Sequence, residues 1–360
     1  MTERVNLLAM TPDGARDALT AFAERHGLPR YRVPQILRHL WVAPAADFRA
    51  MSDVPAALRE QLAAEFDLPR LTLAAEQTSA DGTRKFLFQL HDGQAIETVA
   101  IPDGNRVTLC VSSQAGCALQ CAFCATGAMG FARQLTPDEI AGQVRELALF
   151  DPPLRATNVV FMGMGEPLMN WPAVSVALSI LNSHDGCGIG ARHITVSTVG
   201  VLPGIEALAA RPEQFRLAIS IHAPSDALRR ELMPVNVKYP LADVIAAARG
   251  FDRRVTFEYV MLGGVNDRDE HAHALAVLAR DCGAFVNLIP LHPGGAMGFE
   301  PTARARIVRF ARLLRELGVE TAIRKSRGVD IAAACGQLRV ENLRRRPKAG
   351  AQQDRQVHVP

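Results

Sequence analysis

The segment GCALQCAFCATG, residues 116–127, places three of the chain's seven cysteines within eight positions. Thiolates select zinc or iron–sulfur clusters, and four protein ligands are usual where the metal is structural. Three neighbouring thiols, Cys117, Cys121 and Cys124, leave one coordination position open. In a cubane cluster, an iron without a protein ligand can bind a small molecule and pass it an electron. The three thiols therefore indicate either a metal site that takes its fourth ligand from elsewhere in the chain or an iron–sulfur cluster with one open position.

The remaining composition is that of a globular protein in a reducing compartment. The chain has 360 residues, 48% of them hydrophobic, without an apolar run of about 18 residues that would suggest a membrane span. Its start, MTERVNLLAM, lacks the pattern of a secretory signal. An odd cysteine count with a clustered trio does not suggest a disulfide framework. We expect a cytoplasmic protein with no membrane partner.

Charge alone does not identify a partner. The total is +3, but five basic residues against one acid give the last 18 residues a charge of +4. The rest of the chain is therefore near −1, which provides no independent case for nucleic acid. Residues 341–360 are expected to form a basic, disordered tail.

The apolar pattern divides the chain into parts. Residues 1–80 show apolar positions three and four apart, which predicts a small helical domain. Residues 81–104 predict a β-hairpin connector turning at Asp92-Gly93. Residues 105–340 alternate apolar strands with helices about six times, which predicts parallel βα units in an α/β barrel or wound sheet.

The helix after the cysteine run has a defined start in LTPDEI, with Thr136 as its cap, Pro137 at the first position and Glu139 at the third. Parallel strands bring their carboxyl ends to one rim, where ligands gather in α/β folds. Four polar residues at predicted strand ends would share that rim: Glu166, Ser197, Ser220 and His222.

Six segments occur in an order that resembles a known family. They are SSQAGCALQCAFCATGAMGF, GMGEPLMN, ITVSTVGVLPGI, LAISIHAPSDALRRELMPVNVKYPL, VTFEYVMLGGVND and SRGVDIAAACGQL. Together they are similar to the bacterial radical S-adenosylmethionine (SAM) adenine-C2 RNA methyltransferases, over roughly residues 10–340. The resemblance implies a partial (β/α)6 radical SAM barrel with a small N-terminal helical domain. It also implies 23S rRNA and transfer RNA as substrates.

The resemblance implies a [4Fe-4S] cluster on Cys117, Cys121 and Cys124, two SAM molecules per turnover, and an electron donor such as flavodoxin or ferredoxin. The matching SAM contacts are Gly165, Glu166, Ser197, Ser220, Ile221 and His222. A further contact would be His292, where the family usually has asparagine.

Three residues outside the cluster match the family's catalytic groups. Cys335 matches the cysteine that becomes S-methylcysteine and then forms a protein–RNA adduct. Cys110 matches the cysteine that resolves the adduct through a disulfide, and Glu97 matches the base that takes the C2 proton. Cys187 and Cys282 match no functional position.

The residues Arg324, Lys325 and Arg327, shortly before Cys335, would offer positive charge to RNA phosphates. Reaching C2 requires an unstacked adenine, so we expect a single-stranded or loop target.

Two other functions stay open at this point. One is C8 methylation of the same ribosomal adenine, whose enzymes share the cysteines and Glu97. The other is a non-catalytic RNA-binding protein with a structural zinc ion, whose fourth ligand would be Cys110 or a histidine. A thioredoxin-like pair at Cys121 and Cys124 would not explain Cys117.

Overall fold

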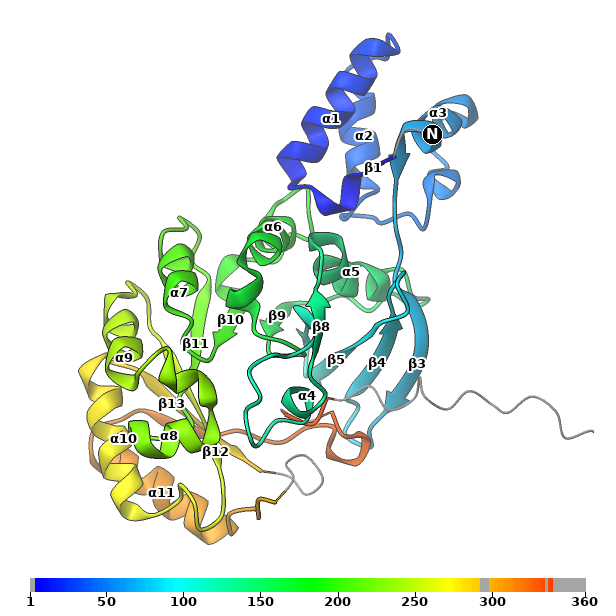
Figure 1. Cartoon of the computed structure of the whole chain (residues 1–360). Helices are drawn as coiled ribbons and strands as arrows, with labels where there is room; N and C mark the ends of the chain where they lie inside the picture. The colour runs from blue at the N-terminus through cyan, green and yellow to red at the C-terminus, as the bar shows by residue number, and fades with distance from the viewer. Residues whose placement is uncertain (1–3, 292–297, 334–335, 339–360) are drawn as a thin grey trace, which may run out of the picture.

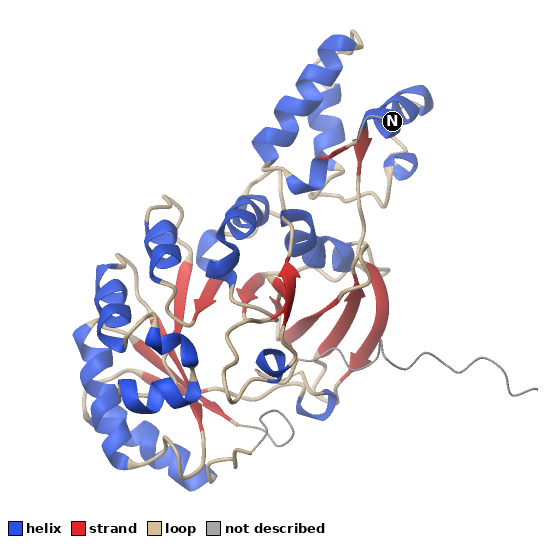
Figure 2. Ribbon diagram, in the orientation of Figure 1, coloured by secondary structure: helices blue, strands red, loops and turns tan. Residues whose placement is uncertain are grey.

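A computed structural model describes residues 4–291, 298–333 and 336–338. Its centre is one curved sheet in which the described residues contribute ten strands, in the order β14-β13-β12-β11-β10-β9-β6-β5-β4-β3 (Figures 1 and 2). The strands from β6 to β14 are parallel. They are β6 (Arg106–Cys110), β9 (Asn158–Phe161), β10 (Ile194–Thr198), β11 (Arg216–Ser220), β12 (Thr256–Met261), β13 (Phe285–Pro290) and β14 (Thr321–Ile323).

Helices cover the outside of the parallel strands. They are α5 (Pro137–Ala148), α6 (Trp171–Asn182), α7 (Leu202–Ala209), α8 (Asp226–Leu232), α9 (Leu241–Gly250), α10 (Asp269–Asp281) and α11 (Arg304–Glu316). They lie on the connections between successive parallel strands, with α8 and α9 sharing the connection from β11 to β12 (Figure 1), so the predicted α/β barrel of parallel βα units is confirmed. Strands with buried residues on both faces explain the continuous apolar runs in the sequence.

The sheet continues into an antiparallel extension made by β3 (Thr72–Thr78), β4 (Arg84–Gln89) and β5 (Ala95–Asp103). The predicted hairpin turn at Asp92-Gly93 lies between β4 and β5, where the Leu90 amide donates to the Gln94 carbonyl at 2.8 Å. Because β5 pairs directly with β6, the hairpin is part of the main sheet. Residues 72–78 also belong to this sheet, so it begins before the helical boundary at residue 80 that the sequence suggested.

The N-terminal residues form a separate lobe above the barrel (Figure 1). It contains α1 (Pro12–Arg25), α2 (Arg32–Arg38), α3 (Ala56–Glu65) and the short parallel pair β1 (Val5–Asn6) and β2 (Phe66–Asp67). Apolar residues at helical spacing point inward in this lobe, and Leu19, Phe22 and Leu62 are almost fully buried. Within the described ranges, no helix is both long and apolar enough to cross a bilayer.

A buried arginine joins this lobe to the barrel. Arg145, in α5, is 2% exposed, and its Nε donates to the Leu40 carbonyl at 2.8 Å while Nη2 donates to the Ala45 carbonyl. Burial lowers the pKa of Arg145 to about 10. The guanidinium satisfies carbonyls that follow α2, so it fixes the lobe on the barrel.

We predict that Arg145→Met reduces the free energy of unfolding by about 2–4 kcal/mol, because two buried carbonyls lose charged donors. Urea unfolding would measure the loss. The matched control is Arg312→Met, which removes an exposed guanidinium on α11 and should change stability by less than about 0.5 kcal/mol. Equal free energies of unfolding for the two variants would contradict a stabilising role for Arg145.

Candidate active site

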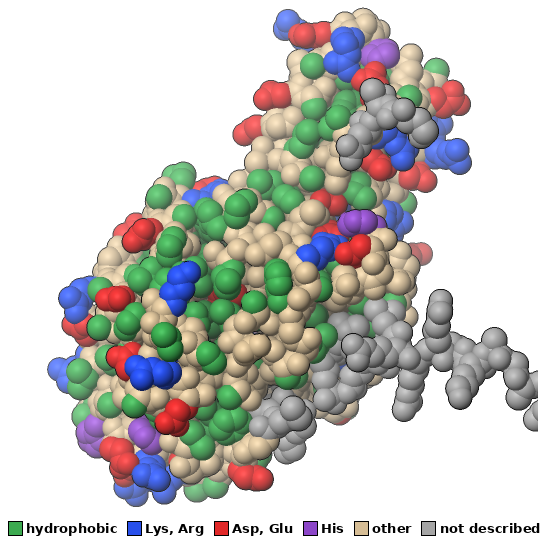
Figure 3. Space-filling model, in the orientation of Figure 1, with side chains coloured by type: hydrophobic (Ala, Val, Ile, Leu, Met, Phe, Trp, Pro, Cys, Tyr) green, Lys and Arg blue, Asp and Glu red, His purple; other side chains and the backbone are tan. Residues whose placement is uncertain are grey.

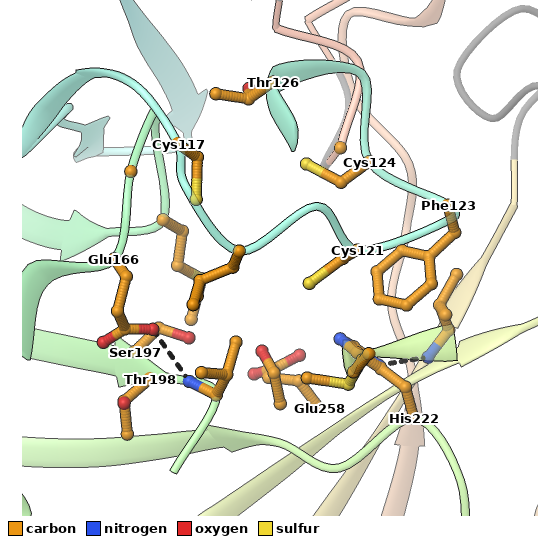
Figure 4. A pocket seen from close by; sticks show the side chains of 18 of the residues that line it. Cys117, Cys121, Phe123, Cys124, Thr126, Glu166, Ser197, Thr198, His222 and Glu258 are labelled. Carbon is orange, nitrogen blue, oxygen red and sulfur yellow. Dashed lines mark hydrogen bonds between the residues drawn. The ribbon is translucent and has the colours of Figure 1, made fainter. Parts of the chain in front are cut away.

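A pocket opens at the carboxyl ends of the parallel strands (Figure 4). The cavity has a volume of about 160 Å³. Nine residues singled out in the sequence line it: Cys117, Cys121, Cys124, Gly165, Glu166, Ser197, Ser220, His222 and Arg324. The fold therefore brings the cysteine run and the predicted strand ends into one cavity.

The cysteine loop is held by a small ribbon formed by β7 (Gln114–Gly116) and β8 (Phe131–Gln134). The Cys117 amide donates to the Gly130 carbonyl at 2.8 Å. Gly116 has φ +82°, and a Cβ there would lie 2.1 Å from the Gly130 carbonyl oxygen, so only glycine fits. The ribbon closes the loop at its base and aims the three thiols into the pocket.

The three thiols face the cavity from one side, as Figure 4 shows. Burial raises the pKa of Cys117 to about 11 and raises that of Cys121 further, with the neighbouring thiols contributing to both shifts. Among the described residues, no three Cys, His, Asp or Glu side chains are grouped closely enough to hold a single metal ion. A cubane cluster has a different requirement, because each thiolate binds a different iron around a shared cavity. The donor set therefore fits such a cluster.

Glu166 forms the opposite wall of the pocket. It is 3% exposed, and its carboxylate accepts hydrogen bonds from the amides of Leu168 at 3.0 Å and Val199 at 2.9 Å. Burial raises its pKa to about 7. Gly165 has φ +99°, and a Cβ there would lie 2.5 Å from the Gln114 side chain, so the chain can bring Glu166 to this place only with glycine before it.

His222 follows β11 and is held in a strained backbone conformation with φ +55°. Its Nδ1 accepts the Val260 amide at 3.0 Å, so in the neutral ring Nε2 carries the proton. Burial lowers the pKa of His222 to about 3, which keeps the ring neutral at physiological pH. The ring meets the edge of Phe123 from the cysteine loop, with centroids 4.7 Å apart.

The other predicted residues lie outside this lining. Ile221 directly follows β11 and is fully buried. Its amide donates to the Glu258 carbonyl in β12 at 3.1 Å, so it continues the pairing of the two strands and does not line the pocket. His292 and Cys335 lie outside the described residues. Cys187 and Cys282, which matched no functional position in the sequence, are free thiols.

Glu97 and Cys110 share one face of the sheet. Cys110 in β6 pairs with Val99 in β5, and Glu97 is two residues from Val99, so both side chains point the same way. Both are buried, with exposures of 4% and 7%. Their common face explains how residues 13 positions apart in the sequence can serve one site.

The residues that follow Cys335 are anchored beside the cysteine loop. The Gly336 carbonyl accepts the Ala125 amide at 2.8 Å, and the Leu338 carbonyl accepts the Thr126 hydroxyl at 2.8 Å. Ala125 and Thr126 belong to α4 (Ala125–Ala128), directly after Cys124. Gly336 and Leu338 also line the pocket.

Sequence reasoning missed two buried charged groups at the site. Arg229 in α8 donates to the Ile221 carbonyl at 3.2 Å and to the Asn236 side chain at 2.7 Å, and burial lowers its pKa to about 10. Glu258 in β12 lines the pocket, accepts from Asn287 at 2.8 Å, and has a pKa raised by burial. The sequence offered one signal for these groups, which is the charged residue Glu258 inside the apolar strand VTFEYVML.

A partial parallel barrel with a three-cysteine loop after its first parallel strand defines the radical SAM class. The family model described as "Radical SAM superfamily" matches residues 111–276. A crystal structure of a radical SAM methyltransferase from Sphaerobacter thermophilus is 45% identical, with a TM-score of 0.86, and the match covers 93% of this chain and 99% of that one. SAM and a [4Fe-4S] cluster are the cofactors of this class.

The chain belongs, within that class, to the family of dual-specificity RNA methyltransferases RlmN. A family model for the "Ribosomal RNA large subunit methyltransferase N-terminal domain" matches residues 5–68. A probable RlmN from Gemmatimonas aurantiaca is 67% identical over 359 residues, covering 100% of both chains. The RlmN of Anaeromyxobacter dehalogenans is 48% identical over 322 residues, covering 86% of both chains.

We predict that Gly165→Ala weakens SAM binding by at least about tenfold, because the added methyl group pushes Glu166 and Gln114 apart at a strained φ. Equilibrium dialysis with the anaerobic protein would measure the dissociation constant. Gly250→Ala is the control, since a Cβ there meets nothing within 4 Å. Unchanged affinity in Gly165→Ala would refute the role given to this turn.

Proposed function

We propose that this enzyme methylates C2 of an adenine in 23S rRNA, at the peptidyl-transferase centre, and of an adenine in transfer RNA. The relatives' name, dual-specificity RNA methyltransferase, supports an RNA substrate. The structural observation that carries the proposal is the arrangement around the cysteine loop. Glu97 and Cys110 share one sheet face, and the residues that follow Cys335 are tied to α4 beside the cluster ligands.

Adenine C2 requires unusual chemistry because it is an electron-poor carbon and does not attack the methyl group of SAM as a nucleophile would. When bound, the cluster supplies the electron that cleaves SAM to a carbon radical able to start the reaction. Gly165 and Glu166 would hold the amino end of SAM, and Ser197 with the residues from Ser220 to His222 would hold the rest. Neutral His222 can donate one hydrogen bond through Nε2.

Cys335 would carry the methyl group. Its sulfur takes a methyl from one SAM, and loss of a hydrogen atom to a radical from a second SAM leaves a thiomethylene radical on the protein. That carbon bonds to C2 of adenine, so protein and RNA become covalently linked. Two SAM molecules are thus used for each methyl group delivered.

Glu97 and Cys110 would complete the reaction. The radical adduct would return one electron to the cluster that was oxidised in SAM cleavage, and Glu97 would take the proton from C2. The Cys110 thiolate then attacks the Cys335 sulfur, which forms a disulfide and breaks the bond between sulfur and the methylene carbon. The electron pair passes to that carbon, which takes a proton and becomes the methyl group. A thiol reductant must then reduce the disulfide before the next turnover.

The competing functions have less support. C8 methylation uses the same cysteines, but the relatives matched over the full length of this chain bear the RlmN name. A non-catalytic zinc protein does not account for membership of the radical SAM superfamily. The RNA and the cluster's reductant, such as flavodoxin or ferredoxin, would meet the enzyme in the cytoplasm.

Basic side chains near the pocket would bind RNA phosphates. Arg324 lines the pocket and Lys325 beside it is exposed. On the face seen in Figure 3, by contrast, Lys and Arg side chains are scattered and mixed with acids over much of the surface. Binding would therefore depend on this local patch and on an adenine turned out of its stack, which suits a loop target.

We predict that Cys110→Ala traps the RNA on the protein, since no second thiol attacks the Cys335 sulfur. Anaerobic reaction with an rRNA fragment, followed by a denaturing gel and nucleoside mass spectrometry, would separate adduct from free methylated RNA. The adduct should accumulate while free C2-methyladenosine falls by at least about a hundredfold.

Cys282→Ala is the matched control, because Cys282 lies between α10 and the amino end of β13, is not part of the pocket lining, and donates its thiol to the Leu278 carbonyl. This variant should release methylated RNA as the wild type does. Normal yields of free product from Cys110→Ala would exclude the resolving role.

A further inference from the structure

Glu97 is paired with a buried lysine from the neighbouring strand. The Lys85 ammonium lies 3.1 Å from Glu97 Oε1, and the two side chains are only 10% and 5% exposed. In the β4–β5 register Lys85 pairs with Val99 and Leu87 pairs with Glu97, so Lys85, Glu97 and Cys110 all point to the same face.

The same ammonium contacts the segment that leads to Cys335. Lys85 Nζ donates to the Ala332 carbonyl at 3.4 Å, three residues before Cys335. The β3–β4 hairpin holds this segment at two further places. Asp330 accepts the Ser79 hydroxyl at 2.5 Å and the Ala80 amide at 3.1 Å, and Asp81 accepts the Gly328 amide at 3.0 Å.

Stability does not explain an ion pair at this position. Desolvating an ammonium and a carboxylate costs several kcal/mol each, and a buried pair is often no more stabilising than apolar residues of similar size. The neighbouring Leu87 and Val99 show that this face accepts apolar side chains. A lysine between a carboxylate and the loop carbonyl therefore points to a functional role.

We infer that Lys85 is a positioning residue for adduct resolution. Its ammonium keeps the Glu97 carboxylate ionised and holds it beside the segment that leads to Cys335. The inference rests on the proposed function. Lys85 acts through Glu97 and through the Ala332 carbonyl, and it does not itself contact the reacting base.

The inference separates two stages of the reaction. Methyl transfer to the Cys335 sulfur needs no base at Glu97, so loss of the ammonium should leave it largely intact. Removing the C2 proton needs an ionised carboxylate, and a buried carboxylate without its ammonium partner favours the neutral form. Loss of Lys85 should therefore stall the enzyme after the carbon–carbon bond has formed.

The test compares Lys85→Met, Lys85→Gln and Lys85→Arg with wild type, all as the reconstituted full chain with an rRNA fragment. Peptide mass spectrometry measures methyl on Cys335, a denaturing gel measures adduct, and nucleoside analysis measures C2-methyladenosine. Arg84→Met is the matched control, because Arg84 on the same strand pairs with Glu76 at 2.7 Å and both side chains are 32% exposed.

Lys85→Met and Lys85→Gln should retain methyl on Cys335, accumulate adduct, and release product at least about tenfold more slowly, because a buried carboxylate without a neighbouring cation favours the neutral form. Lys85→Gln can still donate to the Ala332 carbonyl, so a shared defect assigns the effect to the charge. Lys85→Arg, which restores a cation, should recover most product release, and Arg84→Met should match wild type.

Product release at the wild-type rate by either neutral variant would overturn the inference. It would also be overturned if both neutral variants lost methyl on Cys335 and cluster content together, because Lys85 would then be purely structural. A wild-type enzyme that formed no C2-methyladenosine would instead defeat the proposed function itself.

Discussion

The site depends on the closure of the cysteine loop at its base. The carbonyl of Gly130 reaches the Cys117 amide only because Gly116 has no side chain to obstruct it. That contact turns Cys117, Cys121 and Cys124 toward the ends of the parallel strands, where the Gly165–Glu166 turn forms the facing wall. Both walls of the pocket thus depend on glycines at positive φ, one on each side. A cavity with thiols on one side and a buried carboxylate on the other suits a cluster and a charged amino acid derivative.

Buried charge recurs around this pocket, and in each case it joins segments that are distant in sequence. Arg229 ties the chain after β11 to the turn around Asn236. Glu258 is held by Asn287 from the next strand. Lys85 connects the hairpin to the segment before Cys335. Glu258 lines the pocket itself, whereas Arg229 holds the chain next to His222 and Lys85 holds the segment before Cys335. Their desolvation costs free energy that apolar side chains would not cost, and each fixes a segment that carries or adjoins a predicted site residue.

The sequence predicted the parallel barrel because apolar strands and amphipathic helices alternate regularly, and it predicted the hairpin because Asp92-Gly93 is a strong turn signal. It also predicted that Glu166, Ser197, Ser220 and His222 would meet, since parallel strands share one rim. It did not reveal the partners of Arg145, Lys85 or Glu258. A charged residue inside an apolar strand shows that a partner must exist, but only the register and the sheet order identify it. The place of β3 in the main sheet was missed for a related reason, because an exposed edge strand carries little apolar pattern.

The central claim is that three thiols hold a cubane cluster with one iron open to SAM. Iron and sulfide analysis of the anaerobically reconstituted full chain, combined with electron paramagnetic resonance of the reduced protein, tests it most directly. The account predicts about four iron and four sulfide per chain and a resonance spectrum that changes when SAM is added. A protein that bound neither iron nor sulfide, or a cluster whose spectrum was indifferent to SAM, would contradict it.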